Sequence, residues 1–389
     1  MGQTAGPVDR PRVALVAHGI HDHGGMERAF AELVRHAHHD FHIVVVAPDL
    51  APELRPLVEW ERVRVPARPI PLRFVWFFVA GGLRVRRSRA DIVHTMGAIV
   101  PNRCDIATVQ FCHAGYREAT GALAPPDAPR LRRLNTTVAR LLALAAERWC
   151  YRSGRARVLA AVSEGVGREL RSHYPGPRVA VTPNGVDTDR FRPDAAARRR
   201  LREAEAVGDE EIVALFVGGD WDRKGLAVAI EALALTEARP RLWVVGEGDD
   251  RRFAALARAH GVADRVRFFG PRHDTERYYQ AADVFVFPTQ YEAFPLVALE
   301  AAASGLAIVA TPVNGVEEIV GDDAGFLVRR EADAVACAFA KLAADADARR
   351  QMGEAARCRS AEYSWGDVVG RVLALYAELA AGGSGRRAA

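Results

Sequence analysis

Two series of short apolar runs, each separated by longer helical stretches, constrain the fold more than any other feature of the chain. The first series consists of RVALVA from Arg12, FHIVVVAP, DIVHT, IATVQ, RVLAAVS and RVAVTPN. The second follows the charged segment 193–211 and consists of EIVALFVG, RLWVVGEG, RVRFFG, ADVFVFP, LAIVAT and AGFLV. Such alternation indicates parallel sheets with helices on both faces. The sequence therefore predicts an α/β protein with two doubly wound Rossmann-like domains.

The length of 389 residues also favours two domains, because it exceeds what one compact core usually holds. We expect one domain over residues 1–188 and a second over residues 189–380, joined near residues 184–192. The stretch 365–380 has helical periodicity and is expected to pack on a domain surface, and the small, polar tail 381–389 is expected to be disordered. A ligand cleft between the domains would receive the carboxyl ends of strands from both.

Composition excludes several other classes of protein. The net charge of +4 is a mild excess and no nucleic-acid docking motif accompanies it, so we expect no nucleic-acid partner. The five cysteines are scattered without C-x-x-C spacing, which is typical of reduced thiols in a cytoplasmic protein. The longest apolar stretch, Phe74–Leu83, falls short of the roughly 20 residues that a membrane-spanning helix needs.

A pair of glycines, Gly24 and Gly25, follows the first strand and opens a helix. Glycines let backbone amides approach a ligand closely, and a helix N-terminus favours phosphate. A plain strand-to-helix turn explains the same residues equally well.

Two adjacent cations, Arg223 and Lys224, follow the strand that ends at Gly218 and precede a helix expected from Leu226. Cations at a helix start oppose its dipole, so their placement favours a nearby anion such as a diphosphate. The alternative is a surface network in which Asp220 and Asp222 neutralise them.

Two glutamates, Glu292 and Glu300, flank the start of a helix after the strand 283–287. Pro295 suits a first helical turn, which places Glu292 in the preceding loop and Glu300 within the helix. A carboxylate can accept hydrogen bonds from two vicinal hydroxyls, so one glutamate suits a sugar and the other a ribose. Each glutamate taken singly is more often a solvated surface residue.

Five motifs occur in an order that resembles retaining glycosyltransferases of family four. They are Gly24–Glu27, Pro183–Asp187, Arg223–Gly225, Val245–Gly248 and the pair Glu292-x7-Glu300, and the resemblance covers residues 12–375. The resemblance implies the GT-B fold, with the first domain on the acceptor side and the second binding the nucleotide sugar. The stretch Trp221–Leu226 also looks like lipopolysaccharide-core glucosyltransferases.

The resemblance implies roles for individual residues. Arg223 and Lys224 would bind the donor diphosphate, Glu292 the sugar hydroxyls and Glu300 the ribose. The other donor-binding positions are glycines, an asparagine and a stretch of backbone: Gly24, Gly25, Asn184, Gly218, Gly246, Ala293, Phe294, Pro295 and Leu296. The sequence departs from many relatives at Ala293, where they carry glycine or serine, and at Asp220, where they carry arginine.

His113, after the strand 106–110, matches the histidine that the family places beside the donor sugar and the acceptor. A structural histidine is the alternative. Seven other histidines between His18 and His42 have no recognised ligand spacing, so we expect no metal site.

Taken together, the resemblance implies a retaining, metal-independent hexosyltransferase that needs no cofactor. Its partners would be a nucleotide sugar and a glycan, lipid-linked or small-molecule acceptor. A nucleotide-sugar epimerase, a phosphorylase of similar shape and a non-catalytic partner subunit remain as alternatives.

An aromatic segment, Pro71–Phe78, precedes several cations, which predicts reversible docking of the first domain on an anionic membrane or acceptor. These cations are Arg84, Arg86, Arg87, Arg89, Arg130, Arg132, Arg133 and Arg140. The alternative is that the aromatics form a buried helix face and the arginines are merely solvated.

Overall fold

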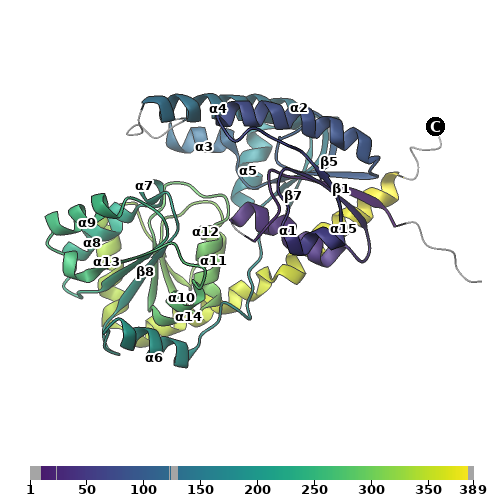
Figure 1. Cartoon of the computed structure of the whole chain (residues 1–389). Coiled ribbons are helices and arrows are strands. Elements are labelled where there is room, and N and C mark those ends of the chain that lie inside the picture. Colours follow the sequence, from purple (N-terminus) through teal and green to yellow (C-terminus); the bar gives the residue numbers. More distant parts are fainter. Residues whose placement is uncertain (1–9, 23, 122, 124–129, 384–389) are drawn as a thin grey trace, which may run out of the picture. The chain divides into compact units, whose positions relative to one another are not determined.

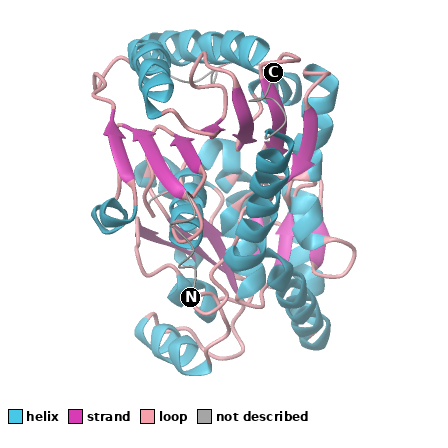
Figure 2. Ribbon diagram, turned by 90° about the vertical axis from the view of Figure 1, so that its right-hand side faces the viewer, coloured by secondary structure: helices cyan, strands magenta, loops and turns pink. Residues whose placement is uncertain are grey.

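The computed structural model describes residues 10–22, 24–121, 123 and 130–383. The chain divides into two compact units, one of residues 1–184 together with 366–389 and one of residues 185–365. Each unit contains one parallel sheet with helices on both faces, as Figures 1 and 2 show. The predicted fold class is confirmed.

The first unit is built on a seven-stranded parallel sheet of order β3-β2-β1-β4-β5-β6-β7. Six strands match the expected runs, and the edge strand β3 was not predicted because EWER has no apolar pattern. The strands are β1 (Arg12–Val16), β2 (His42–Ala47), β3 (Glu59–Arg62), β4 (Ile92–Met96), β5 (Cys104–Val109), β6 (Ala156–Ala161) and β7 (Arg178–Val181).

Helices cover both faces of this sheet. Val13 and Leu15 of β1 pack in the cluster that includes Phe30 of α1, whereas Val16 packs in the cluster with Phe77 of α2. Strands covered on both faces are apolar throughout, which explains the continuous runs in the sequence. The helices of this unit are α1 (Gly25–Ala37), η1 (Pro52–Leu57), α2 (Ile70–Ser88), α3 (His113–Thr120), α4 (Arg130–Cys150), α5 (Glu164–His173) and α15 (Trp365–Gly383).

The last helix, α15, corrects the expected domain boundaries. Its apolar side chains Val369, Val372, Leu375 and Leu379 belong to the core cluster of the first unit. Tyr376 also donates or accepts a 2.6 Å hydrogen bond with Nδ1 of the buried His94. The helix therefore returns to the first unit rather than extending the second, which ends at residue 365. It continues through Gly383, so residues 381–383 of the expected tail are helical, and 384–389 lie outside the described residues.

The second unit is built on a six-stranded parallel sheet of order β10-β9-β8-β11-β12-β13. All six strands match expected runs: β8 (Val213–Val217), β9 (Arg241–Val245), β10 (Val266–Gly270), β11 (Val284–Phe287), β12 (Ala307–Ala310) and β13 (Gly325–Leu327). Its helices are α6 (Ala195–Ala204), α7 (Trp221–Lys224), α8 (Leu226–Ala234), α9 (Asp250–Ala259), η2 (Ala263–Arg265), α10 (Glu276–Ala281), α11 (Leu296–Ala303), α12 (Val316–Val320), α13 (Ala332–Ala344), α14 (Ala346–Ser360) and η3 (Ala361–Tyr363).

The order of strands reverses between β1 and β4 in the first sheet and between β8 and β11 in the second. Open parallel sheets bind ligands at the carboxyl ends of strands beside such a reversal. The loop with Gly24 and Gly25 follows β1, the segment with Arg223 and Lys224 follows β8, and Glu292 follows β11. Topology thus places the main sequence candidates at the two reversal points.

Candidate functional site

The segment after β8 bends back so that Lys224 lies against the end of its own strand. Gly218 has φ of 129°, and a Cβ added there would lie 2.1 Å from Nζ of Lys224. The ammonium also lies 5.3 Å from the centroid of the Phe287 ring. Among the described residues, none forms a hydrogen bond or ion pair with this ammonium, and burial lowers its pKa. Lys224 is therefore a poorly solvated cation near carboxylates, of which Glu292 acts on it most strongly, but without a direct ion-pair partner among the described residues.

Arg223 points to a different set of partners. Its Nε lies 2.8 Å from Oδ2 of Asp220, and its Nη1 lies 2.7 Å from Oε1 of Glu292. Nη1 also donates to the carbonyl of Tyr291. Arg223 therefore fixes the loop that carries Glu292, and two residues predicted to bind the donor separately form an ion pair with each other.

The local helix differs from the expectation. Arg223 and Lys224 end the four-residue helix α7, and Gly225 with φ of 83° separates them from α8. Cations at a helix C-terminus are favourable, so the predicted conflict with the helix dipole is wrong. Of the two aspartates proposed as an alternative, Asp220 pairs with Arg223 and Asp222 pairs with Arg252 at 2.8 Å.

Glu292 lies in the loop before α11, as predicted, and its side chain is 14% exposed. Its Oε1 also accepts a 3.2 Å hydrogen bond from the hydroxyl of Thr289. The carboxylate is thus held from two sides by Arg223 and Thr289.

Glu300 lies within α11, where the hydroxyl of Tyr279 donates to its Oε2 at 3.1 Å. Pro295 caps α11, and the intervening backbone of Ala293 and Phe294 is buried. A Cβ added at Gly315 would lie 2.6 Å from Cα of Phe294, so this backbone packs directly on a glycine. Leu296 is the first residue of α11.

Gly246 directly follows β9 with φ of 136°, and a Cβ added there would lie 2.2 Å from the carbonyl oxygen of Gly218. The backbones of two predicted donor-binding glycines are therefore in contact. Any larger residue at Gly246 would displace the strand end that Lys224 lies against.

In the first unit, Gly24 has φ of 90° and precedes α1, which begins at Gly25. A Cβ at Gly24 would lie 2.6 Å from Oε2 of Glu27, so this carboxylate folds back over the glycine. Asn184 is 3% exposed and exchanges two hydrogen bonds with Gln110, of 2.6 and 2.9 Å. Its side-chain amide is therefore directed to a residue at the end of β5.

His113 begins α3 after β5 and is held by a carboxylate that the sequence analysis did not single out. Oε1 of Glu147 lies 2.8 Å from Nδ1 of His113 and accepts from its backbone N–H at 2.9 Å. The hydroxyl of Tyr174 donates to the other oxygen of Glu147 at 2.7 Å. Glu147 is 2% exposed, so this buried charge is stabilised by three hydrogen bonds. A proton on Nδ1 leaves Nε2 of the neutral ring as an acceptor.

Comparison with known proteins shows to which family this chain belongs. Residues 23–190 match the family model described as Glycosyltransferase Family 4, and residues 197–359 match Glycosyl transferases group 1. The chain is 32% identical over 327 residues to the D-inositol 3-phosphate glycosyltransferase of Xylanimonas cellulosilytica, which covers 77% of this chain and 76% of that relative. The chain belongs to glycosyltransferase family 4.

Two further comparisons concern an enzyme of lipopolysaccharide synthesis. The glycosyltransferase is 32% identical over 184 residues to the lipopolysaccharide glucosyltransferase WaaG of Escherichia coli, over 45% of this chain and 49% of that protein. The crystal structure of a WaaG superimposes with a TM-score of 0.77 at 23% identity, over 92% of this chain and 98% of the other. The architecture is that of the GT-B glycosyltransferases.

The site residues of the glycosyltransferase form two groups. The second unit brings together the backbone and side chains of Gly218, Arg223, Lys224, Gly246 and Glu292, with Glu300 on the following helix. The first unit holds Gly24, Gly25, His113 and Asn184 at the carboxyl ends of β1, β5 and β7.

Three side chains that position site residues were missed. They are Thr289 on Glu292, Tyr279 on Glu300 and Glu147 on His113. A signal existed for Glu147, because it is the single carboxylate among the residues of α4 and lies in an otherwise basic helix. Thr289 and Tyr279 offer no signal, since threonine and tyrosine are common in such strands and helices.

Within the described parts of the glycosyltransferase, no group of three or more His, Cys, Asp or Glu residues is arranged to hold a metal ion. Of the histidine-rich N-terminal stretch, His23 lies outside the described residues.

Proposed function

We propose that this glycosyltransferase transfers a hexose from a nucleotide diphosphate donor with retention of anomeric configuration. The observation that carries the proposal is the Lys224 ammonium, which lies at the end of β8 beside the backbone of Gly218. Burial lowers its pKa although the carboxylates of Glu292, Asp220 and Glu300 lie in its surroundings, and no described residue forms an ion pair or hydrogen bond with it. A donor diphosphate would supply a directly paired counter-charge. Lys224 would then stabilise the additional negative charge that develops on the departing phosphate.

The neighbouring carboxylates suit the two sugars of such a donor. Arg223 and Thr289 both bind Oε1 of Glu292, so Oε2 is the oxygen that these two residues leave for a ligand. We assign Glu292 to hydroxyls of the transferred sugar and Glu300 to the ribose. The backbone from Ala293 to Leu296 would lie along the sugar and phosphates, with Gly246 keeping the strand end open.

The proposed mechanism uses no protein nucleophile. The acceptor hydroxyl attacks the face from which the nucleotide leaves, and the leaving phosphate takes the acceptor proton. His113, fixed by Glu147, would lie beside the reacting sugar and help to exclude water. Gly24, Gly25 and Asn184 are the residues of the first unit that we propose as donor ligands.

We also propose that the reaction needs neither a metal ion nor another cofactor. Asp220-x-Asp222 is an acidic pair within the phosphate segment, and arginines already pair with both carboxylates. Cations of the protein such as Lys224 would then stabilise the negative charge on the departing phosphate, which a divalent ion does in metal-dependent enzymes. Activity is expected to persist in EDTA, and loss of activity restored by Mg²⁺ or Mn²⁺ would contradict this part of the proposal.

The acceptor class is proposed from the relatives. One relative is named for D-inositol 3-phosphate and another for lipopolysaccharide, so phosphorylated polyols and envelope glycans are the first acceptors to test. The test begins with a thermal-stabilisation screen of nucleotide sugars, followed by acceptor assays with the best donor. Product analysis by NMR gives the anomeric configuration, for which retention is expected.

The same experiments separate the alternatives. An epimerase would convert the donor sugar without an acceptor, and a non-catalytic subunit would bind a donor but turn over none of the acceptors. Inversion of the anomeric centre would contradict the retaining mechanism and leave the transfer reaction standing.

Membrane docking of the first unit is a further part of the proposal. Helices α2 and α4 lie side by side, as Figure 1 shows. α2 exposes Leu72, Val75, Trp76, Val79 and Leu83, whose spacing of three and four residues makes one stripe. α4 exposes Leu131, Leu134, Val138 and Leu141 with the same spacing.

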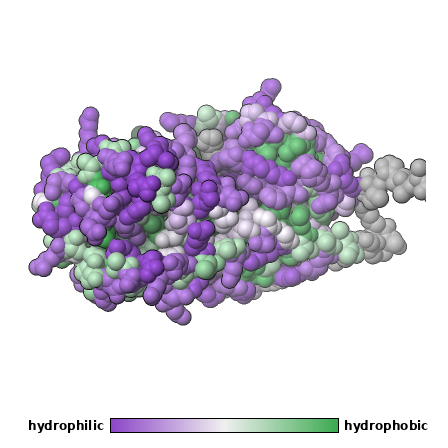
Figure 3. All heavy atoms as spheres, turned by 90° about the horizontal axis from the view of Figure 1, so that it is seen from below, coloured by the Kyte–Doolittle hydropathy of each residue, from purple (hydrophilic) through white to green (hydrophobic). Residues whose placement is uncertain are grey.

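The aromatic side chains of α2 divide between a buried and an exposed face. Phe77 is fully buried, whereas Trp76 is 53% exposed. α2 contains no acidic residue, and the single carboxylate of α4 is the buried Glu147. In the view from below in Figure 3, hydrophilic side chains predominate and apolar ones form separate patches. Apolar stripes with basic and no exposed acidic residues suit an anionic lipid surface. None of the helices that the structure describes is long and apolar enough to cross a membrane.

A further inference from the structure

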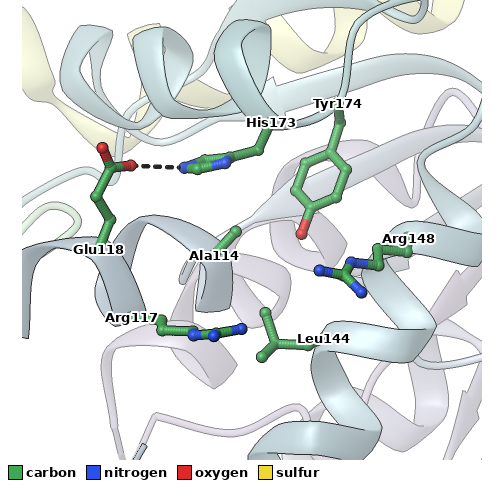
Figure 4. A pocket seen from close by; sticks show the side chains of 7 residues that line it. All are labelled: Ala114, Arg117, Glu118, Leu144, Arg148, His173 and Tyr174. Atoms are coloured by element: carbon green, nitrogen blue, oxygen red, sulfur yellow. Dashed lines mark ion pairs between the residues drawn. The ribbon is translucent and has the colours of Figure 1, made fainter. Parts of the chain in front are cut away.

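A pocket lies within the first unit, between α3, α4 and the end of α5. It has a volume of about 400 Å³ and is lined by the seven side chains of Figure 4: Ala114, Arg117, Glu118, Leu144, Arg148, His173 and Tyr174. None of these residues was assigned a role in donor binding. One of them, Ala114, is the chain neighbour of His113.

The pocket carries an excess of positive charge. Arg117 from α3 and Arg148 from α4 extend into it, and Tyr174 directs its hydroxyl between the helices (Figure 4). Within the described ranges, no carboxylate lies within ion-pair distance of either guanidinium, in contrast to the paired Arg223 and Arg202. His173 lies 3.0 Å from Glu118, so this carboxylate contacts the imidazole rather than either guanidinium. The two exposed guanidinium groups thus share one pocket without an ion-pair partner of their own, and an anion between them would be attracted by both.

The inner wall of the pocket touches the residues that hold His113. The hydroxyl of Tyr174 donates to Oε2 of Glu147 at 2.7 Å, and Oε1 of Glu147 lies 2.8 Å from Nδ1 of His113. A ligand that takes the Tyr174 hydrogen bond would remove one of the three donors from Glu147. Glu147 would then bind the His113 ring more strongly, because a buried carboxylate needs its remaining donors.

We propose that this pocket binds a phosphate or carboxylate group and that its occupancy changes the hydrogen bonding of His113 through Tyr174 and Glu147. The guanidinium groups of Arg117 and Arg148 bind the anion from two sides, since guanidinium is the side chain best matched to such groups. The binding site stands independently of the proposed function, whereas the consequence for catalysis rests on the proposed role of His113.

The first experiment measures binding of inorganic phosphate by calorimetry at constant ionic strength. The protein carries Lys224→Ala throughout, so that phosphate at the donor site does not contribute. Arg117→Gln and Arg148→Gln are each expected to weaken binding roughly tenfold, the loss of one charge-assisted contact. Arg132→Gln is the matched control, because Arg132 is an exposed arginine of α4 that does not line the pocket. Absence of binding, or equal weakening by all three substitutions, overturns the site.

The second experiment follows the His113 ring by NMR during the phosphate titration. Phosphate is expected to shift the signals of the His113 ring in the Lys224→Ala protein. Adding Tyr174→Phe is expected to change the affinity for phosphate less than threefold but to abolish this shift. A shift that persists in Tyr174→Phe overturns the coupling.

Repeating the titration with D-inositol 3-phosphate identifies the source of the anion. If D-inositol 3-phosphate binds at least tenfold more tightly than inorganic phosphate, and if Arg117→Gln and Arg148→Gln abolish this gain, the pocket binds a phosphorylated acceptor. If the two ligands bind with equal affinity, the pocket binds a separate small anion.

Discussion

Lys224 and Arg223 are neighbours in the chain, but their cations lie in different surroundings. The Lys224 ammonium faces glycine backbone and an aromatic ring, whereas the Arg223 guanidinium faces Asp220 and Glu292. Neighbouring residues near a helix end point in different directions, so the pair Arg-Lys in the sequence says nothing about this division of roles.

This difference predicts distinct effects on donor binding. Lys224→Gln is expected to weaken both the nucleotide diphosphate and the nucleotide sugar by on the order of 10²-fold, because it removes the cation that faces the phosphates. Arg223→Gln is expected to weaken the nucleotide sugar more than the nucleotide diphosphate, because it releases Glu292. Arg252→Gln, which breaks the exposed pair with Asp222, serves as the control. Titration calorimetry with both ligands checks this, and equal losses for both ligands in Arg223→Gln would refute the positioning of Glu292.

Glu147 is predicted to act through His113. Glu147→Gln removes the charge that orients the ring and is expected to lower kcat by on the order of 10²-fold while the donor KM changes less than threefold. The substitution leaves a buried polar group imperfectly paired, so unfolding should become easier by about 1–3 kcal/mol. The decisive measurement is a double-mutant cycle: in a His113→Ala background, Glu147→Gln is expected to lower kcat no further. A full additional loss in that background would show that Glu147 acts independently of His113.

At the scale of single elements, α2 carries apolar side chains on two opposite faces. One face, with Phe77 and Val85, packs on the sheet, and the other, with Trp76 and Val79, is exposed. A helix that packs on a sheet needs only one apolar face. The second, exposed face of α2 is therefore suited to contact another apolar surface.

Vesicle co-sedimentation tests the surface formed by α2 and α4. Binding is expected to be at least several-fold stronger to vesicles with anionic lipid than to neutral ones at low salt, since each nearby arginine contributes about 1 kcal/mol. Trp76→Ser with Val79→Ser, and separately replacement of Arg86, Arg87 and Arg89 by Gln, should each reduce it. Leu235→Ser, at a leucine 61% exposed in the second unit, is the control. Equal binding to neutral and anionic vesicles would leave a soluble acceptor as the ligand of this surface.

α15 is the element on which the first unit depends most clearly. Removal of residues 366–389 exposes the core face that Val369, Val372, Leu375 and Leu379 cover, at about 1.5–3 kcal/mol for each large side chain. Tyr376→Phe removes only the hydroxyl that bonds to His94 and should cost about 1–3 kcal/mol. Urea unfolding of the full chain and the two variants checks both values. A truncated chain that unfolds like the wild type would contradict the assignment of α15 to the first unit.

At the scale of the whole molecule, the first unit is expected to be the more sensitive to acid. Burial lowers the pKa of His94 to about 3, and burial with Arg73 nearby lowers that of His18 to about 4. Below the ordinary histidine pKa of about 6.5, His94 and His18 bind protons in the unfolded chain but stay neutral in the folded unit. The free energy of unfolding therefore falls with pH from about 6.5 down to these values, by up to about 1.4 kcal/mol per pH unit for each histidine, and is unaffected by them above pH 7.

Urea unfolding at pH 7, 5.5 and 4.5 measures this slope. His94→Gln should be less stable at pH 7 and should lose less stability on acidification than the wild type. His260→Gln, at an exposed histidine of the second unit, should leave the slope unchanged. An unaltered slope in His94→Gln would mean that other groups determine the acid response.

The sequence by itself determined the two parallel sheets and the position of each motif at a strand end. These features follow from local patterns, because a strand buried on both faces must be apolar along its whole length and glycines mark backbone that approaches closely. Twelve of the thirteen strands in the described part of the chain were predicted for this reason.

Only the tertiary structure decided which distant residues meet. His113 and Glu147 are 34 positions apart, Arg223 and Glu292 are 69 apart, and His94 and Tyr376 are 282 apart. No periodicity records such pairs, because packing of whole elements brings them together. The return of α15 to the first unit has the same cause: its apolar face fits either unit by composition, and the free surface beside β1, β2 and α1 is where that face is buried.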